Sequence, residues 1–195
     1  MNLEKYKKII KTRLSEERFI HCLNVSKEAR NLAEKYGADP KKAEIAGLLH
    51  DATKETPQEE QMEFINKLNI KLSDAEINSF KLLHSVSGYA YAILELGIKD
   101  KDILNAIRYH TSGRAKMSLL EKAVFVADFI SRDRKYKSVK KMRSIAYISL
   151  DEAVINGIEY TVTSLFKKRS VLDPKGIEAY NTILLENKVK TFDNN

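Results

Sequence analysis

The chain has 195 residues, of which 43% are hydrophobic and 31% charged, and its formal net charge is +7. A chain of this length fits one domain over residues 1–195 and can bury a core without disulfide staples. The moderate positive charge is typical of a lysine-rich surface and does not by itself indicate an anionic partner.

Cysteine usage and hydropathy predict an intracellular protein. Cys22 is the single cysteine, so no internal disulfide can form and a reducing, cytoplasmic setting is expected. Residues 1–8 lack the apolar core of a signal peptide, and no apolar stretch approaches the length of a membrane span. We therefore expect a cytoplasmic protein without a membrane segment.

Helix signals recur along the whole chain. Each of the three prolines follows a residue that can cap a helix, as Asp39 precedes Pro40. Gly37 and Gly97 stand where helices would end. Three residue pairs have the spacing of a capping box: Thr56 with Glu59, Ser73 with Glu76, and Ser118 with Glu121.

Between these signals the apolar residues recur at helical rather than alternating spacing. The predicted helices cover residues 3–13, 15–36, 40–53, 57–68, 73–83, 85–96, 100–110, 118–131, 138–146, 149–168 and 174–188. The predicted fold class is all-α, with a motif-bearing core at about 15–135 and C-terminal helices over 138–188.

Histidines and aspartates stand out in apolar surroundings. His50 and Asp51 are adjacent in residues 47–54, His21 lies in the second predicted helix, and Asp128 lies in the apolar run 124–130. A carboxylate is costly to bury unless it is paired or bound to a metal. Imidazole with carboxylate suits iron, manganese or zinc and leaves positions open for water and substrate. The pattern, with His84 and His110 between, predicts a metal-dependent hydrolase.

Ordinary structural interpretations remain open for these residues. A single helical histidine is more often part of the core or surface than a ligand, and Asp128 could pair with Arg132 four residues later. The basic stretch 132–143 could bind nucleic acid, but a solvated surface explains it equally well. Tyr136 is its single aromatic residue and makes no stacking platform, so nucleic acid is not an expected partner.

Whole segments are similar to the YqeK family of HD-domain metal-dependent phosphohydrolases. These segments are residues 18–21, 46–54, 106–114 and 117–128, together with His84. Members of this family are bacterial symmetrical bis(5′-nucleosyl)-tetraphosphatases, which hydrolyse diadenosine tetraphosphate to two ADP. The resemblance therefore implies an HD-domain helical bundle, additional C-terminal helices, a nucleotide substrate and this reaction.

The resemblance also implies site residues. The metal ligands would be His21, His50, Asp51 and Asp128, binding one or two divalent ions, with iron expected and manganese or cobalt as alternatives. Asp51, His84 and His110 would be catalytic; His84 and His110 would either contact the phosphates or complete a second metal site. The expected substrate-binding residues are Arg18, Lys54, His84, His110, Thr111, Arg114, Lys122 and Arg134, since a tetraphosphate needs surrounding donors.

Two departures from the family pattern lie away from these ligands. After Asp128 the family tends to have an acidic residue and a proline before an arginine, whereas this chain has the run Ser131-Arg132-Asp133-Arg134, in which only Arg134 keeps its place. The family's late His-Pro is replaced by Asp173 and Pro174. Two other functions stay open: hydrolysis of another nucleotide, and a non-catalytic nucleotide-binding regulator. A homodimer is expected from base rates and the resemblance.

Overall fold

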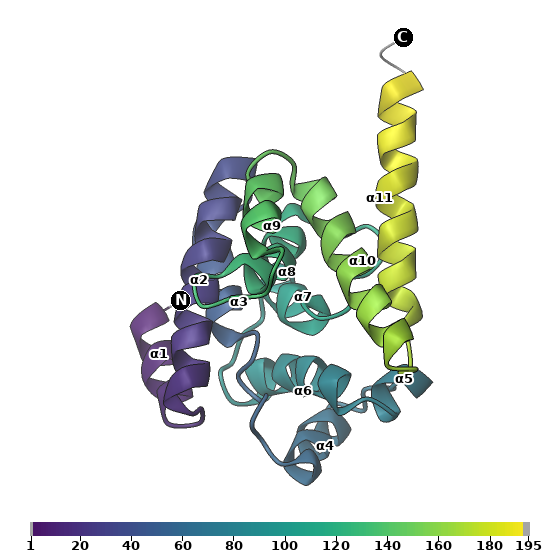
Figure 1. Cartoon of the computed structure of the whole chain (residues 1–195). Coiled ribbons are helices and arrows are strands. Elements are labelled where there is room, and N and C mark those ends of the chain that lie inside the picture. The colour runs from purple at the N-terminus through teal and green to yellow at the C-terminus, as the bar shows by residue number, and fades with distance from the viewer. Residues whose placement is uncertain (1, 193–195) are drawn as a thin grey trace.

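The computed structural model describes residues 2–192, with side chains up to residue 187, and within them every regular element is an α-helix. The helices in chain order are α1 (Leu3–Lys11), α2 (Glu16–Tyr36), α3 (Pro40–Leu49), α4 (Gln58–Lys67), α5 (Asp74–Ile77), α6 (Phe80–Leu94), α7 (Lys101–Tyr109), α8 (Leu119–Ile130), α9 (Val139–Ala146), α10 (Leu150–Lys167) and α11 (Pro174–Phe192) (Figure 1). The predicted all-α class is confirmed. Within residues 2–192, no helix combines the length and apolar composition needed to cross a bilayer.

One predicted helix boundary is wrong near His84. The sequence predicted a break between residues 83 and 85, whereas the break lies at residues 78–79, between α5 and α6. The side-chain amide of Asn78 donates to the carbonyl of Asp74 at 2.8 Å. Such a side chain competes with the helical backbone and favours a helix end. His84 consequently lies inside α6 rather than at the end of a helix.

The capping predictions are partly confirmed. The reciprocal bonds of the capping box are present at Ser73 and at Ser118. The box predicted at Thr56 is wrong: Pro57 itself precedes the first helical residue of α4, which has no side-chain cap bond. The buried Thr56 hydroxyl instead accepts a hydrogen bond from Arg13 at 3.2 Å. Gly37 ends α2 in the left-handed conformation, as predicted.

Four central helices position the residues of interest. α2 packs against α3 and α8, and α7 packs against α3, α6 and α8. Their facing sides contribute fully buried apolar residues, among them Leu32, Leu48, Ile107 and Phe125. Because these helices pack against one another, polar residues on their facing sides lie near one another in the interior of the protein.

Close packing of α2 against α3 depends on Gly47, three residues before His50. A Cβ at Gly47 would lie 3.0 Å from both the Cα of Ser26 and the carbonyl oxygen of Val25, which are backbone atoms. We expect Gly47→Ala to lower the free energy of unfolding by about 1–3 kcal/mol, although alanine normally stabilises a helix relative to glycine.

Gly88 on α6 is a matched control for this substitution. A Cβ there would meet its nearest neighbour, on Ile107, at 3.4 Å, an ordinary contact. Gly88→Ala is therefore expected to be neutral or stabilising in urea unfolding. Equal unfolding free energies for the two variants would contradict the role given to Gly47.

The C-terminal helices line one side of α8. α9 and α10 pack against α8, and α11 packs against α10, while the far end of α11 extends beyond the body of the protein (Figure 1). At the near end of α11, the Lys175 ammonium lies 3.2 Å from the carboxylate of buried Glu76, which fixes α11 to α5. α8, which carries Asp128, therefore packs against both α9 and α10.

Candidate metal centre and active site

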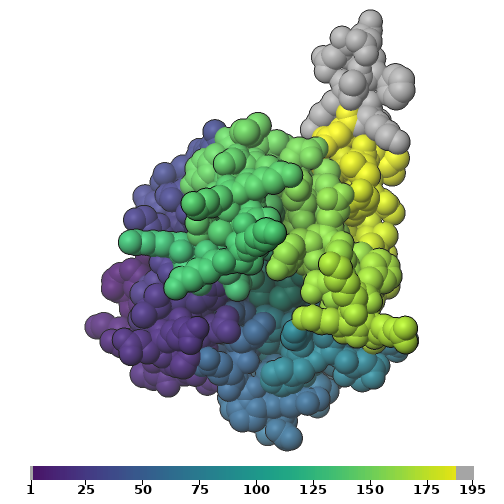
Figure 2. Space-filling model, viewed as in Figure 1, coloured from purple at the N-terminus to yellow at the C-terminus, as the bar shows by residue number. Residues whose placement is uncertain are grey.

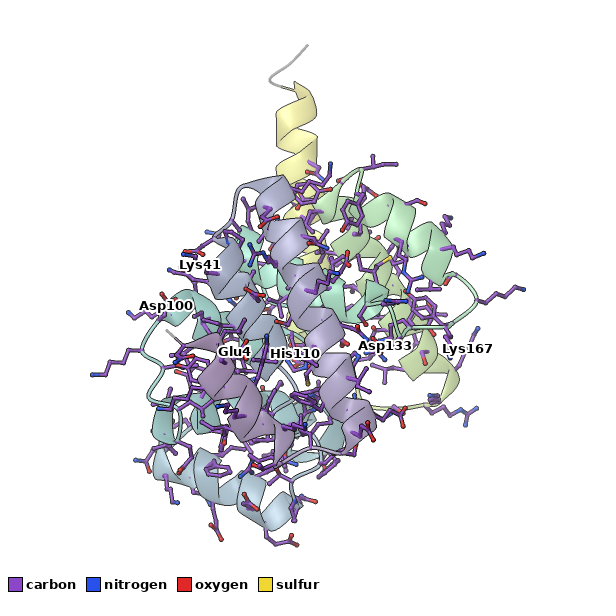
Figure 3. All side chains as sticks on the ribbon, turned by 90° about the vertical axis from the view of Figure 1, so that its left-hand side faces the viewer. Glu4, Lys41, Asp100, His110, Asp133 and Lys167 are labelled. Carbon is purple, nitrogen blue, oxygen red and sulfur yellow. The ribbon has the colours of Figure 1, made fainter. Side chains whose placement is uncertain are left out.

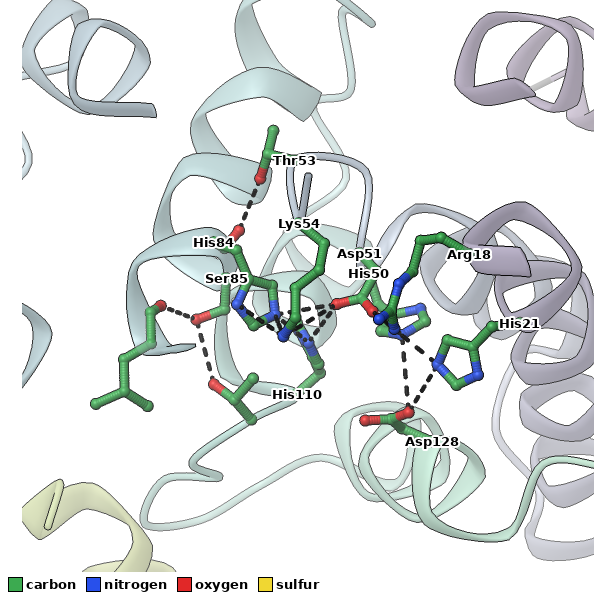
Figure 4. Close-up of polar contacts among 12 residues, drawn as sticks. Arg18, His21, His50, Asp51, Thr53, Lys54, His84, Ser85, His110 and Asp128 are labelled. Atoms are coloured by element: carbon green, nitrogen blue, oxygen red, sulfur yellow. Dashed lines mark hydrogen bonds and ion pairs between the residues drawn. The ribbon is translucent and has the colours of Figure 1, made fainter. Parts of the chain in front are cut away.

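Six histidine and aspartate residues converge at the centre of the protein from five segments (Figure 4). His21 comes from α2, His84 from α6 and Asp128 from α8, while His50 and His110 immediately follow α3 and α7. All four histidines and Asp51 are buried. The structure therefore brings together every residue predicted to bind metal, together with His84 and His110. The six are His21, His50, Asp51, His84, His110 and Asp128.

The first group consists of His21, His50, Asp51 and Asp128. His21 Nε2 lies 3.0 Å from Asp128 Oδ1 and 4.0 Å from Asp51 Oδ2. His50 Nε2 lies 3.5 Å from the same Asp51 oxygen and 3.9 Å from Asp128 Oδ1. Candidate ligand atoms of His21, His50 and Asp51 all lie within 4.8 Å of one another, a spacing that suits a common ion.

Hydrogen bonds on the far side of the two rings favour a cation between them. His50 Nδ1 donates to the carbonyl of Gly47 at 2.7 Å, and His21 Nδ1 donates to Asp133 at 2.8 Å. Neutral rings held in this way point the lone pair of Nε2 inward. Among the described residues, the buried Nε2 atoms of His21 and His50 have no hydrogen-bond partner. Two such atoms facing carboxylates fit a divalent metal ion.

Electrostatics within the first group favour positive charge beside the Asp128 carboxylate. Burial lowers the pKa of His21, but the adjacent carboxylate of Asp128 outweighs burial and raises it overall. Burial lowers the pKa of His50. Burial raises the pKa of Asp128, but His21 and Arg134 outweigh it and hold that pKa well below its usual range. The carboxylate is therefore ionised at neutral pH and favours a cation beside it.

A second group consists of Asp51, His84 and His110, and its candidate ligand atoms also lie within 4.8 Å of one another. Asp51 Oδ1 lies 3.0 Å from His84 Nε2 and 3.5 Å from His110 Nε2, and the two Nε2 atoms are 3.1 Å apart. His110 Nδ1 donates to the carbonyl of Ile107 at 2.8 Å, so its Nε2 carries the lone pair. Burial lowers the pKa of His84 to about 4, which leaves this ring neutral at pH 7.

Asp51 joins the two groups, because its Oδ2 faces His21 and His50 whereas its Oδ1 faces His84 and His110. Burial raises the pKa of Asp51, but His50 and then the other two facing rings outweigh burial and hold it well below its usual range. An ionised carboxylate with one oxygen toward each set of imidazoles can bridge two metal ions.

Three cationic side chains surround the cluster. Arg18 Nη1 lies 2.9 Å from Asp51 Oδ2, and Arg134 contacts both the carboxylate and the backbone carbonyl of Asp128. Lys54 Nζ lies 3.2 Å from each ring nitrogen of His84, and burial lowers the pKa of Lys54. All three donors are predicted substrate residues, and all three lie where an anionic group at the cluster would meet them.

The other predicted substrate residues divide into two kinds. Thr111 lies beside His110 at the wall of a cavity and donates to Ser85 Oγ at 3.3 Å. Arg114 instead makes two hydrogen bonds, at 2.6 and 2.9 Å, to the buried carboxylate of Glu121. Lys122, also buried, donates to Asp151 at 2.6 Å. The structure therefore pairs Arg114 and Lys122 with carboxylates of α8 and α10.

Asp133 is a site residue that the sequence analysis missed. One of its carboxylate oxygens accepts the hydrogen bond from His21 Nδ1, and the other accepts from Asn24 Nδ2 at 3.0 Å. In Figure 3, Asp133 lies beside α2. The sequence offered one signal, a carboxylate next to Arg134 in the segment where the chain departs from the family pattern. The alternative pairing of Asp128 with Arg132 is replaced by pairing with Arg134.

Two openings flank the cluster, on a face that is hollowed near its centre (Figure 2). On one side lies a cavity of about 240 Å³, which His110, Asp128 and Lys54 share with apolar side chains that include Phe125 and Phe129. On the other side lies a polar hollow of about 520 Å³ with Arg18, His21 and Arg134 in its wall. A ligand longer than one nucleotide can thus extend from the cluster in more than one direction.

Comparisons with known proteins agree with this site. A model of the HD domain family matches residues 18–133. Two proteins named "Bis(5′-nucleosyl)-tetraphosphatase, symmetrical" are each 40% identical to the chain. The match to the Halalkalibacterium halodurans protein covers 96% of this chain and all of that protein, and the match to the Bacillus subtilis protein covers 94% and 98%.

A crystal structure from Clostridium acetobutylicum, described as a predicted HD superfamily hydrolase involved in NAD metabolism, has the same fold. It matches with a TM-score of 0.91 and 36% identity over 95% of this chain and 98% of that one. Fold and cluster together define a hydrolase of the HD superfamily. The chain belongs to the family of symmetrical bis(5′-nucleosyl)-tetraphosphatases, which confirms the resemblance found in the sequence.

Proposed function

We propose that the protein hydrolyses diadenosine tetraphosphate at the central anhydride and releases two molecules of ADP. The observation that carries this proposal is Asp51 between two imidazole groups, with Arg18, Lys54 and Arg134 around them. The relatives' activity, as their names state it, matches this arrangement. Phosphoanhydride hydrolysis needs positioning and charge stabilisation more than covalent chemistry from the protein.

We assign one divalent ion to His21, His50, Asp51 and Asp128 and a second to Asp51, His84 and His110. Bound metal supplies Lewis acidity toward phosphoryl oxygens and lowers the pKa of water from about 15.7 to roughly 7. Iron is the proposed metal, with manganese and cobalt as alternatives, because imidazole and carboxylate ligands suit all three. Metal analysis of the purified protein tests this identity.

The protein's own residues orient and neutralise the substrate. The carbonyls of Gly47 and Ile107 fix the rings of His50 and His110, so little reorganisation is needed when ligands bind. Arg18 and Arg134 stand on one side of the cluster and Lys54 on the other. Cations on both sides can share the charge of a phosphate chain that crosses the cluster, while the apolar cavity accepts one nucleoside.

Product analysis tests the proposed reaction. The protein is incubated with diadenosine tetraphosphate and iron, manganese or cobalt, and the products are separated by ion-exchange chromatography. ADP as the sole product is expected. A mixture of AMP and ATP would show cleavage at another anhydride and contradict the proposal. Nucleotide binding without turnover under any metal would instead support a regulator.

Asp133→Asn is expected to weaken metal binding at His21 by about 10- to 100-fold, the usual effect of losing an outer hydrogen-bond partner of a ligand histidine. The amide keeps the size of Asp133 but no longer stabilises the donating Nδ1–H of His21 with a full charge. Metal affinity, measured by competition with a chelator, gives the answer without an activity assay. Unchanged affinity with an intact fold would remove Asp133 from the site.

Two further properties belong to the proposal. We place the protein in the cytoplasm, because its one cysteine, Cys22, is buried and unpaired. We also propose that the protein forms a homodimer, which sedimentation of the purified chain tests directly.

A further inference from the structure

A groove between α9 and α10 brings three aromatic residues together beside the active site. Phe129, Tyr136 and Tyr160 line this groove of about 500 Å³. The rings of Tyr136 and Tyr160 have centroids 5.2 Å apart, and Tyr160 meets Phe129 edge-on at 6.3 Å. We call these three residues the aromatic ledge. Tyr136 is the single aromatic residue of the basic stretch, but in the fold its ring contacts that of Tyr160.

The ledge is continuous with the proposed metal centre. Phe129 follows Asp128 and lines both the groove and the cavity that contains Asp128 and His110. Tyr136 lies two residues after Arg134, whose guanidinium contacts Asp128, so the groove adjoins the cluster. A nucleotide whose phosphates lie at the metal centre can therefore place its nucleoside at the ledge.

The ledge keeps one of its three rings, that of Tyr160, accessible. Gly157 on α10 lets the ring of Phe129 approach closely, since a Cβ there would lie 3.2 Å from that ring. Tyr160 is 50% exposed although it contacts both other rings. An exposed ring backed by two others is suited to stack with a nucleobase, an interaction available to any purine.

Charge distinguishes the groove from the polar hollow on the other side. The groove carries three lysines, Lys141, Lys167 and Lys168, against the single carboxylate of Glu159. The hollow has two arginines, which already contact Asp51 and Asp128, against four carboxylates. These are Glu16, Glu17, Glu55 and Asp133. The groove therefore attracts an anionic nucleotide more strongly than the hollow does, and the two arginines of the hollow lie beside the cluster.

We propose that the aromatic ledge binds the second nucleoside of the dinucleotide, by stacking its purine on Tyr160. The inference rests on the proposed function, because a substrate cleaved into two equal halves needs a nucleoside site on each side of the central anhydride. The cavity beside His110 takes the first nucleoside, and the ledge takes the other. The ledge thereby selects dinucleotides over nucleotides that have one base.

Adenosine 5′-tetraphosphate is the matched probe, because it has the same phosphate chain but lacks the second adenosine. In Tyr160→Ala, we expect the ratio of kcat/KM for diadenosine tetraphosphate to that for adenosine tetraphosphate to fall by about 5- to 100-fold. Tyr160→Trp should retain the ratio. The chain contains no other tryptophan, so the fluorescence of the introduced tryptophan side chain should change when the dinucleotide binds. Turnover is prevented in this experiment by the Asp51→Asn substitution or by withholding metal.

Tyr147→Ala is the control, since Tyr147 is also partly exposed, at 41%, and contacts Glu28 rather than the groove. An unchanged ratio in Tyr160→Ala would overturn the ledge. A ratio that falls in Ile20→Ala instead would place the second nucleoside at the polar hollow, whose wall contains Ile20. Failure of the wild-type protein to form ADP from the dinucleotide would instead overturn the proposed function, so the two failures are distinguishable.

Discussion

Asp51→Asn is expected to remove most of the bound metal and to lower kcat/KM for diadenosine tetraphosphate by about 1000-fold or more, equivalent to several kcal/mol of lost charge stabilisation. Asp51 is the residue shared by both ligand groups, with one oxygen toward each. Asparagine keeps the shape of the side chain but offers one oxygen and no charge. Metal content and the rate of ADP formation are the measurements.

A surface aspartate provides the control for this substitution. Asp102 is 56% exposed and pairs with Lys42 on α3, so Asp102→Asn should keep both metal content and activity. Circular dichroism of both variants separates loss of metal from loss of fold. An Asp51→Asn protein that is folded and retains full metal content would show that Asp51 is not a ligand.

Local chemistry explains why so much of the fold could be predicted. Caps at Asp39, Ser73 and Ser118 and the left-handed Gly37 act within a few residues of their own positions, so the sequence reveals them directly. The break before α6 could not be predicted in the same way. It depends on an Asn78 side chain that bonds back to the helix, and a residue of this type is equally compatible with a solvent-facing position.

The candidate site shows the same division between local and long-range effects. His50 and Asp51 are adjacent, and a buried carboxylate indicates a partner wherever it occurs. The partner's identity is a property of the fold: Asp133 meets His21 across 112 positions of sequence, which no helical periodicity encodes. Lys122 was predicted at the substrate because a tetraphosphate needs surrounding cationic donors, yet its ammonium donates to Asp151 of α10.

The aromatic ledge depends on contacts between residues that are distant in the sequence. Tyr136 lies in the loop before α9, and Tyr160 lies 24 positions later on α10. Only the packing of α8, α9 and α10 brings the two rings and Phe129 together. A scan for aromatic residues spaced along one segment therefore finds a single tyrosine where the protein has a three-ring surface.

His84→Gln is expected to reduce the bound metal from about two ions per chain to about one, and to lower kcat/KM by about 100-fold, if two ions share the work of charge stabilisation. Because burial keeps the pKa of His84 at about 4, its ring is neutral at pH 7 and offers a lone pair rather than a positive charge. A neutral ring 3.0 Å from Asp51 Oδ1 and 3.1 Å from His110 Nε2 is suited to an ion between them. Metal analysis alongside steady-state kinetics measures both effects.

His110→Gln should reproduce the loss of one ion, because His110 belongs to the same group, whereas His21→Gln should remove the other ion. The remaining alternative for His84 and His110 is a direct contact with the phosphates. In that case the wild-type protein and His84→Gln would hold the same amount of metal, and the substitution would raise KM. The two roles thus differ in a quantity, metal per chain, that is measured before any substrate is added.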